Sequence, residues 1–296
     1  MKIEAYLKRR QRRVDNALKR WIPREKDYPS EIHRAMHYSL DAGGKRLRPI
    51  LILAAAEAVG GRSADALPLA CSLELIHTYS LIHDDLPAMD DDDFRRGKPT
   101  CHKVFGEAIA ILAGDALLTE AFRLLTRPDL MKGIPPSRRL RAIHVVALAA
   151  GSLGMVGGQT VDILSEGRKV SGEVLEYIHR HKTGALITAS VCAGGIAGGA
   201  SSSQLKALAG YGENLGLAFQ IIDDLLDVQG SAKKIGKAVG KDASKGKVTY
   251  PGLFGVEISR DVAESLIAQA IEYLAPLNRR AAPLREIARF VLERTR

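Results

Sequence analysis

Residues 63–93 read SADALPLACSLELIHTYSLIHDDLPAMDDDD, a long apolar segment that ends in a run of carboxylates. Ser63 is a good helix N-cap, and apolar side chains then recur at helical spacing as far as Asp84 and Asp85. Pro87 bends or ends this helix. The stretch therefore predicts a buried helix that presents several carboxylates at the mouth of a cavity.

A second carboxylate cluster lies in FQIIDDLLD, residues 219–227. Asp223 and Asp227 are four residues apart, so both project from one face of a predicted helix. Two such clusters favour a hard ion such as magnesium, which keeps several waters and is completed by substrate phosphates. A solvated acidic loop or a surface pair would explain either cluster alone. Both clusters end apolar helices, and this repetition favours a metal site.

The rest of the chain predicts an all-α fold, because no stretch shows a convincing strand alternation. The chain has no obvious linker and no tandem repeat, so we expect one all-helical domain spanning residues 1–296. The segment Gly230–Gly246 is rich in lysine and glycine and is expected to form a basic loop that closes over the site. Helices are expected over about 30–43, 46–59, 63–85, 103–113, 115–126, 137–151, 153–166, 173–200 and 204–228, with others near 252, 261 and 283.

The formal net charge is +9, which suits nucleic acid, an anionic membrane or a polyanionic small substrate. No nucleic-acid-binding signature is present, and we interpret the basic residues before position 27 as a solvated helix face. Basic residues elsewhere flank glycines or turns, where guanidinium and ammonium groups can bind phosphate oxygens. These are Lys45, Arg46, Arg48, Arg95, Arg96, Lys182, Lys237 and Lys247. As a set they predict a substrate that carries several phosphates.

Cys71, Cys101 and Cys192 are scattered and form no paired motif, which is typical of a reducing compartment. The first twenty residues are too charged for a signal peptide, and 185–200 is too short for a membrane span. We therefore expect a cytoplasmic protein with no transmembrane segment and no nucleic-acid partner.

The order of the motifs resembles the trans-polyprenyl diphosphate synthases, and among them the bacterial farnesyl type. The matching motifs are GGKRxRP from position 43, DDxxxxD followed by RRG, GGQxxD at 157–162, KTG at 182–184, FQxxDDxxD and a late GK. The resemblance implies an isoprenoid synthase-type bundle of about ten core helices around a central cavity, usually as a homodimer. It also implies condensation of isopentenyl diphosphate with dimethylallyl or geranyl diphosphate to give farnesyl diphosphate, through a magnesium-assisted allylic carbocation. Geranyl and geranylgeranyl diphosphate are the alternative products.

The resemblance assigns roles to matching positions, with about three magnesium ions in each active site. The metal ligands would be Asp84, Asp85, Asp90, Asp223, Asp224 and Asp227. The allylic diphosphate would contact Arg95, Lys182, Thr183, Gln220 and Lys237. Isopentenyl diphosphate would contact Lys45, Arg48, His77 and Arg96, with Lys247 a weaker candidate. The catalytic set would be Asp84, Asp85, Asp90, Asp223, Lys182 and Arg95.

The first cluster places Asp84 and Asp90 six residues apart, which would separate them on an ideal helix. Pro87 lets the chain leave helical geometry and bring Asp90 back, as the resemblance to the farnesyl type implies. Tyr79 and Ser80 precede Asp84 by five and four residues, or about 6–8 Å along the helix. A tyrosine there would form the floor of the cavity and favour the fifteen-carbon product, although core packing alone would also explain it.

Three other classes compete with this interpretation. His83-Asp84 matches the first pair of an HD-type metal phosphohydrolase, for which His33 and His37 would have to serve as further ligands. A terpene cyclase shares the fold and the ionisation step but typically lacks the GGKR motif. A non-catalytic synthase subunit usually loses one aspartate motif, and this chain keeps both.

Overall fold

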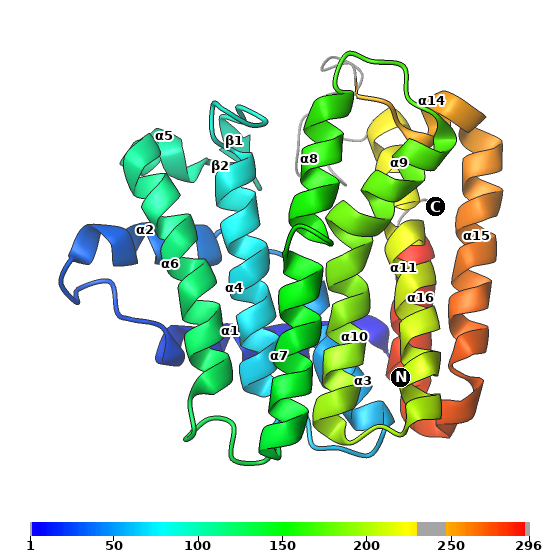
Figure 1. Ribbon diagram of the computed structural model, residues 1–296, viewed down its shortest axis with the longest axis horizontal. Helices are drawn as coiled ribbons and strands as arrows, with labels where there is room; N and C mark the ends of the chain where they lie inside the picture. Colours follow the sequence, from blue (N-terminus) through cyan, green and yellow to red (C-terminus); the bar gives the residue numbers. More distant parts are fainter. Residues whose placement is uncertain (1, 230–246, 294–296) are drawn as a thin grey trace.

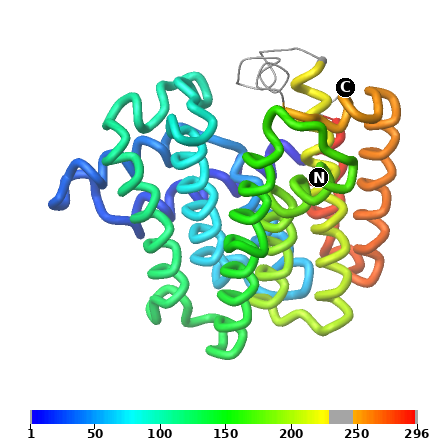
Figure 2. The backbone as a smooth tube through the Cα atoms, turned by 45° about the horizontal axis from the view of Figure 1, so that its top comes forward, coloured from blue at the N-terminus to red at the C-terminus, as the bar shows by residue number. Residues whose placement is uncertain are grey.

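The computed structural model describes residues 2–229 and 247–293 of the 296-residue chain. Long helices run nearly side by side, and α1 crosses behind them (Figures 1 and 2). The first half contains α1 Ile3–Trp21, α2 Ser30–Leu40, α3 Leu47–Ala58, α4 Leu67–Asp84, β1 Phe94–Arg95, β2 Lys98–Pro99, α5 Cys101–Phe105, α6 Glu107–Thr126 and α7 Pro136–Ala150. The second half contains α8 Met155–Ser165, α9 Gly172–Ile178, the π-helical turn η1 His179–Gly184, α10 Ala185–Gly198, α11 Ser202–Gln229, α14 Tyr250–Phe254, α15 Val256–Tyr273, the 3₁₀ segment η2 Ala275–Ala281 and α16 Ala282–Glu293.

The interior helices are α4 and α10, most of whose residues are apolar and buried. Helices of this kind are stable only when neighbouring helices surround them. Helix α4 packs along α6, and α10 packs along α3, α7 and α11. Gly194 of α10 permits one close approach, because a Cβ there would lie 2.3 Å from the Ile52 carbonyl oxygen of α3.

Helix α1 is held by a buried arginine from another part of the chain. The Arg46 guanidinium donates to Asp15 Oδ1 of α1 at 2.8 Å and to Glu74 Oε1 of α4 at 2.7 Å. It also donates to the Leu40 carbonyl oxygen at 2.5 Å. Arg46 therefore has a structural role, because it holds the 43–46 turn against α4, the helix that carries the first aspartates.

The expected all-helical fold is confirmed, with a two-residue antiparallel hairpin, β1–β2, as the exception among the described residues. The expected helix break near Gly114 was wrong. The break falls at Gly106, whose φ of +80° ends α5, and α6 runs unbroken through Gly114. The expected helix over 173–200 is helical as far as Gly198, and it includes the π-helical turn η1.

Among the described residues, one stretch is long and apolar enough to cross a membrane by length and composition, namely Pro136–Ser165 with a mean hydropathy of 1.5. The chain turns within this stretch, between the end of α7 at Ala150 and the start of α8 at Met155. Length and composition alone therefore do not make it a continuous spanning helix.

Candidate active site

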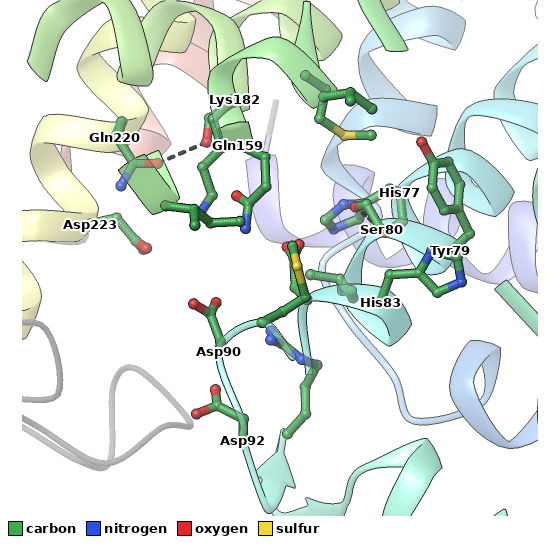
Figure 3. Close-up of a pocket in the computed structure, with 18 of the residues that line it drawn as sticks. His77, Tyr79, Ser80, His83, Asp90, Asp92, Gln159, Lys182, Gln220 and Asp223 are labelled. Carbon is green, nitrogen blue, oxygen red and sulfur yellow. Dashed lines mark hydrogen bonds between the residues drawn. The ribbon is translucent and has the colours of Figure 1, made fainter. Parts of the chain in front are cut away.

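A cavity of about 690 Å³ opens between the ends of α4, α8 and α11. Both predicted aspartate clusters contribute to its wall, through Asp84 and Asp90 on one side and Asp223 and Asp227 on the other. Figure 3 shows Asp90 and Asp223 pointing toward the same space from opposite elements. Aspartates more than 130 positions apart in the sequence thus line one cavity.

The chain after Asp84 turns back on the helix end, as the proline in this loop suggested. The Asp90 amide donates to the Asp84 carbonyl oxygen at 2.8 Å, and the Asp92 amide donates to the Asp85 carbonyl oxygen at 3.2 Å. Asp91, between them, has a φ of +47°. This folded loop places the side chains of Asp84, Asp90 and Asp92 on the cavity wall.

The electrostatic state of Asp84 indicates what the cavity would bind. Burial, together with the nearby Asp90 and Asp85, raises the pKa of Asp84 to about 6, although Lys182 and Arg95 oppose the shift. Carboxylates that repel one another at a partly buried site are stabilised by a multivalent cation. Because the aspartates of both clusters offer carboxylate oxygens, these donors fit a hard divalent ion such as magnesium.

The adjacent aspartates Asp85 and Asp224 are buried and do not line the cavity. Asp85 binds Arg95, whose Nε lies 2.7 Å from Oδ1 and 2.8 Å from Oδ2. Asp224 accepts from Gln220 Nε2 at 3.0 Å and from the Tyr250 amide at 2.9 Å. Neither carboxylate lines the cavity in the described structure, so each positions a neighbour that does.

A cationic pocket adjoins the carboxylates and is formed by Arg48, His77 and Arg96. Burial, opposed by Glu74 and reinforced by Arg96, lowers the pKa of Arg48 to about 10. Burial and the surrounding arginines lower the pKa of His77 well below its usual value. The buried Arg48 Nε has no hydrogen-bond partner among the described residues. Like charges gathered around an unsatisfied donor fit an anionic ligand with several oxygen acceptors.

The GGKR turn shapes this pocket. Gly43 and Gly44 have φ values of +89° and +132°, which favour glycine. The Arg96 guanidinium donates to the Gly43 carbonyl oxygen and occupies the space that a Cβ on Gly44 would need. Lys45, a predicted ligand of isopentenyl diphosphate, lines a neighbouring cavity of about 280 Å³ and not the acidic one. Phe219 lines both cavities and lies between them.

The π-helical turn η1 carries Lys182 and Thr183 into the cavity wall. Insertions of this kind in a helix often occur at functional sites. Lys182 Nζ lies 2.6 Å from Asp162 Oδ2. Thr183 Oγ1 donates to Gln220 Oε1 at 2.9 Å, which is the dashed line at Gln220 in Figure 3. The turn thereby connects α8 and α11 on the side of the cavity opposite α4.

Two residues of the GGQxxD motif belong to the site but had no predicted role. Asp162 fixes Lys182, and Gln159 lines the cavity with a buried Oε1 that has no hydrogen-bond partner among the described residues. Asp92 was also missed, although it lies in the first aspartate cluster. Their motifs were visible in the sequence, but their geometry was not.

The remaining predicted residues either line the site or lie outside the described residues. Lys247 lies in the cavity with its Nζ 2.9 Å from Asp90 Oδ1, so the weaker candidate is well placed. Tyr79 and Ser80 line the cavity below Asp84. Lys237, and the proposed closure of 230–246, lie outside the described residues.

Comparison with known proteins places the chain in a family. The sequence profile described as "Polyprenyl synthetase" matches residues 29–280. The chain belongs to the polyprenyl synthetase family. It is 50% identical over 294 residues to a farnesyl diphosphate synthase of Geobacillus stearothermophilus, covering 99% of this chain and 98% of the relative.

Other members of the polyprenyl synthetase family carry different product names. The chain is 47% identical to a geranylgeranyl diphosphate synthase of Cyanophora paradoxa, covering 98% of this chain and 95% of the relative. The crystal structure of an FPP/GFPP synthase from Zymomonas mobilis superposes with a TM-score of 0.87 at 36% identity, covering 98% of each chain. The expected isoprenoid synthase fold is thereby confirmed.

Proposed function

We propose that this chain is a trans-prenyltransferase that condenses isopentenyl diphosphate with geranyl or dimethylallyl diphosphate to form farnesyl diphosphate. The observation that carries the proposal is the single cavity in which Asp84 and Asp90 face Asp223 and Asp227 beside a cationic pocket. An acidic wall suits a metal-bound diphosphate, and the cationic pocket suits a diphosphate bound directly. One cavity thus offers two diphosphate sites of different chemistry.

Asp84, Asp90, Asp223 and Asp227 would hold magnesium, and we propose about three ions when the allylic substrate is bound. Bound magnesium supplies charge neutralisation for the diphosphate that leaves the allylic carbon. Lys182, Thr183, Gln220 and Arg95 would surround the same diphosphate, with Asp162 and Asp85 fixing the two cationic side chains. These fixed positive charges favour the state in which negative charge builds up on the departing oxygen.

Arg48, Arg96 and His77 would bind the diphosphate of isopentenyl diphosphate. Because its pKa is lowered, His77 is neutral at physiological pH and would act as a hydrogen-bond donor. Lys45 would contribute only from the neighbouring cavity. The allylic C–O bond breaks, the double bond of isopentenyl diphosphate attacks the allylic carbon, and a proton is then lost to the released pyrophosphate. The Arg48 pocket and the aspartate wall orient the two reactants for this attack.

The product length follows from the apolar end of the cavity. Tyr79 is 8% exposed and lies on α4 below Asp84, on the cavity wall. We propose that its ring limits the product to fifteen carbons. Geranyl diphosphate and geranylgeranyl diphosphate are the alternatives, and a relative named for the latter is 47% identical to this chain.

The exposed apolar surface supports a homodimer. Leu112 of α6 and Leu140, Leu148 and Leu153 of the α7 region are 51%, 69%, 49% and 75% exposed. Such a patch on neighbouring elements indicates an interaction surface, and a second copy of this chain is the partner we propose. We also propose a cytoplasmic location, since the three cysteines are unpaired.

The HD-type phosphohydrolase is disfavoured by the histidines it would need. His33 Nδ1 lies 2.9 Å from the Asp27 carbonyl oxygen, and His37 Nε2 lies 2.8 Å from the Pro23 carbonyl oxygen. Neither histidine lines the acidic cavity. The two residues thus have local structural partners away from the aspartates.

The test is incubation with magnesium, labelled isopentenyl diphosphate and geranyl diphosphate, followed by sizing of the labelled product. We expect a fifteen-carbon product, and Asp223→Asn should lower its rate by at least about a hundredfold. Asp261→Asn, an exposed carboxylate of α15, is the matched control and should keep the rate. Absence of any labelled prenyl product would refute the proposal, and a twenty-carbon product would correct its chain length.

A further inference from the structure

His83 and Tyr79 form one ring pair on the cavity wall. The two residues are four apart on α4 and so share a face of the helix. Their ring centroids are 5.8 Å apart with an interplanar angle of 76°. Helical side chains lean toward the N-terminus, and the His83 ring accordingly lies beside Tyr79 (Figure 3).

The His83 ring is held in place by α6. Its Nε2 lies 3.1 Å from the Ile111 carbonyl oxygen. Gly114 leaves the space that the ring occupies, because a Cβ there would lie 2.1 Å from Nε2 and 2.5 Å from Cδ2. Glycine weakens a helix interior, and this contact gives a packing reason for it. The His83 ring therefore packs into the space that is left because residue 114 has no side chain.

The cavity that this ring pair lines also has apolar side chains on its wall. Met155 and Val156 of α8 line it together with Tyr79 and His83. An apolar space below a diphosphate site suits a hydrocarbon chain that extends from the diphosphate. The His83 ring thus has α6 on one side and the space for the hydrocarbon on the other.

We propose that His83, seated against Gly114, is a specificity-determining residue that limits the length of the prenyl chain together with Tyr79. The inference rests on the proposed prenyl transfer. It adds α6, through Gly114, as a second helix that determines the chain length of the product. A methyl group at position 114 displaces the ring toward the cavity and shortens the space for the chain. Removal of the ring lengthens that space.

The test compares four variants in the product-sizing assay with dimethylallyl diphosphate as the starter. His83→Ala should raise the ratio of twenty- to fifteen-carbon product by about tenfold, equivalent to a barrier difference of about 1.4 kcal/mol. Gly114→Ala should shift product toward ten carbons. The double variant should behave as His83→Ala, because no ring remains to be displaced. Gly210→Ala is the matched control, since its methyl would meet the Tyr273 ring at 2.4 Å, away from the cavity.

Circular dichroism and the thermal midpoint show whether each variant is folded. An unchanged product distribution in folded His83→Ala and Gly114→Ala would overturn the inference. Short products that persist in the double variant would do the same, because they would show that the position-114 methyl acts without the ring. Failure of the proposed function is distinguishable, since the unmodified chain would then form no prenyl product at all.

Discussion

Asp84→Asn should stabilise the metal-free protein while abolishing its activity. Burial and neighbouring carboxylates raise the pKa of Asp84 from 3.8 to about 6, so the native state disfavours the ionised form. The unfolded chain ionises at the lower pKa. The contribution of Asp84 to stability therefore falls as the pH rises from about 4 to about 6 and stays low above that range.

The size of this effect follows from the shift. Because the pKa of Asp84 rises from 3.8 to about 6, its ionisation lowers the free energy of unfolding at neutral pH by at most about 3 kcal/mol. Because the carboxylate is partly exposed to the cavity, we expect Asp84→Asn to raise the free energy of unfolding by about 1–3 kcal/mol. The entropy of unfolding of a chain of this length is about 0.6 kcal/mol/K, so the thermal midpoint should rise by about 2–5 °C.

The assay is thermal unfolding by circular dichroism in the presence of a chelator, at about pH 4 and about pH 7.5. Asp84→Asn should be more stable than the unmodified protein at the higher pH and equal to it at the lower pH. Magnesium should then stabilise the unmodified protein more than the variant, because the ion binds the native carboxylate. The control is Asp261→Asn. A variant that is less stable than the unmodified protein at neutral pH would refute the reasoning.

Three further predictions concern other parts of the molecule. Tyr79→Ala should yield prenyl products longer than fifteen carbons in the sizing assay, and an unchanged product would show that the ring only packs the core. Glu74→Ala leaves the buried Arg46 with Asp15 as its remaining carboxylate, so the free energy of unfolding measured in urea should fall by about 3 kcal/mol. A fall below about 1 kcal/mol would contradict the structural role of the Arg46–Glu74 pair. Leu140→Asp with Leu148→Asp should convert a dimer to a monomer in light scattering, whereas an intact dimer would place the interface elsewhere.

The helices could be predicted because apolar periodicity is a local property of the sequence. The break between α5 and α6 was misplaced because glycine has two uses that a sequence does not separate. Gly106 ends a helix through its positive φ, whereas Gly114 continues one and makes room for the His83 ring. The π-helical turn η1 was also missed, since no residue type marks it.

The acidic site could be predicted because clustered carboxylates inside apolar helices need a cation. The different roles of the two adjacent aspartates in each cluster could not be predicted from the sequence. Consecutive residues project from different faces of a helix, so Asp84 faces the cavity while Asp85 fixes Arg95. Arg46 and Lys45 show the same limit, because a basic residue in a turn can bind substrate or hold the fold together.

The central claim is that one cavity joins two diphosphates with release of pyrophosphate. The most direct measurement is a time course that follows labelled farnesyl diphosphate and inorganic pyrophosphate together, with magnesium, isopentenyl diphosphate and geranyl diphosphate present. The account predicts one pyrophosphate for each prenyl product, and no pyrophosphate release when isopentenyl diphosphate is omitted. Release of phosphate or pyrophosphate without a matching prenyl product would contradict it.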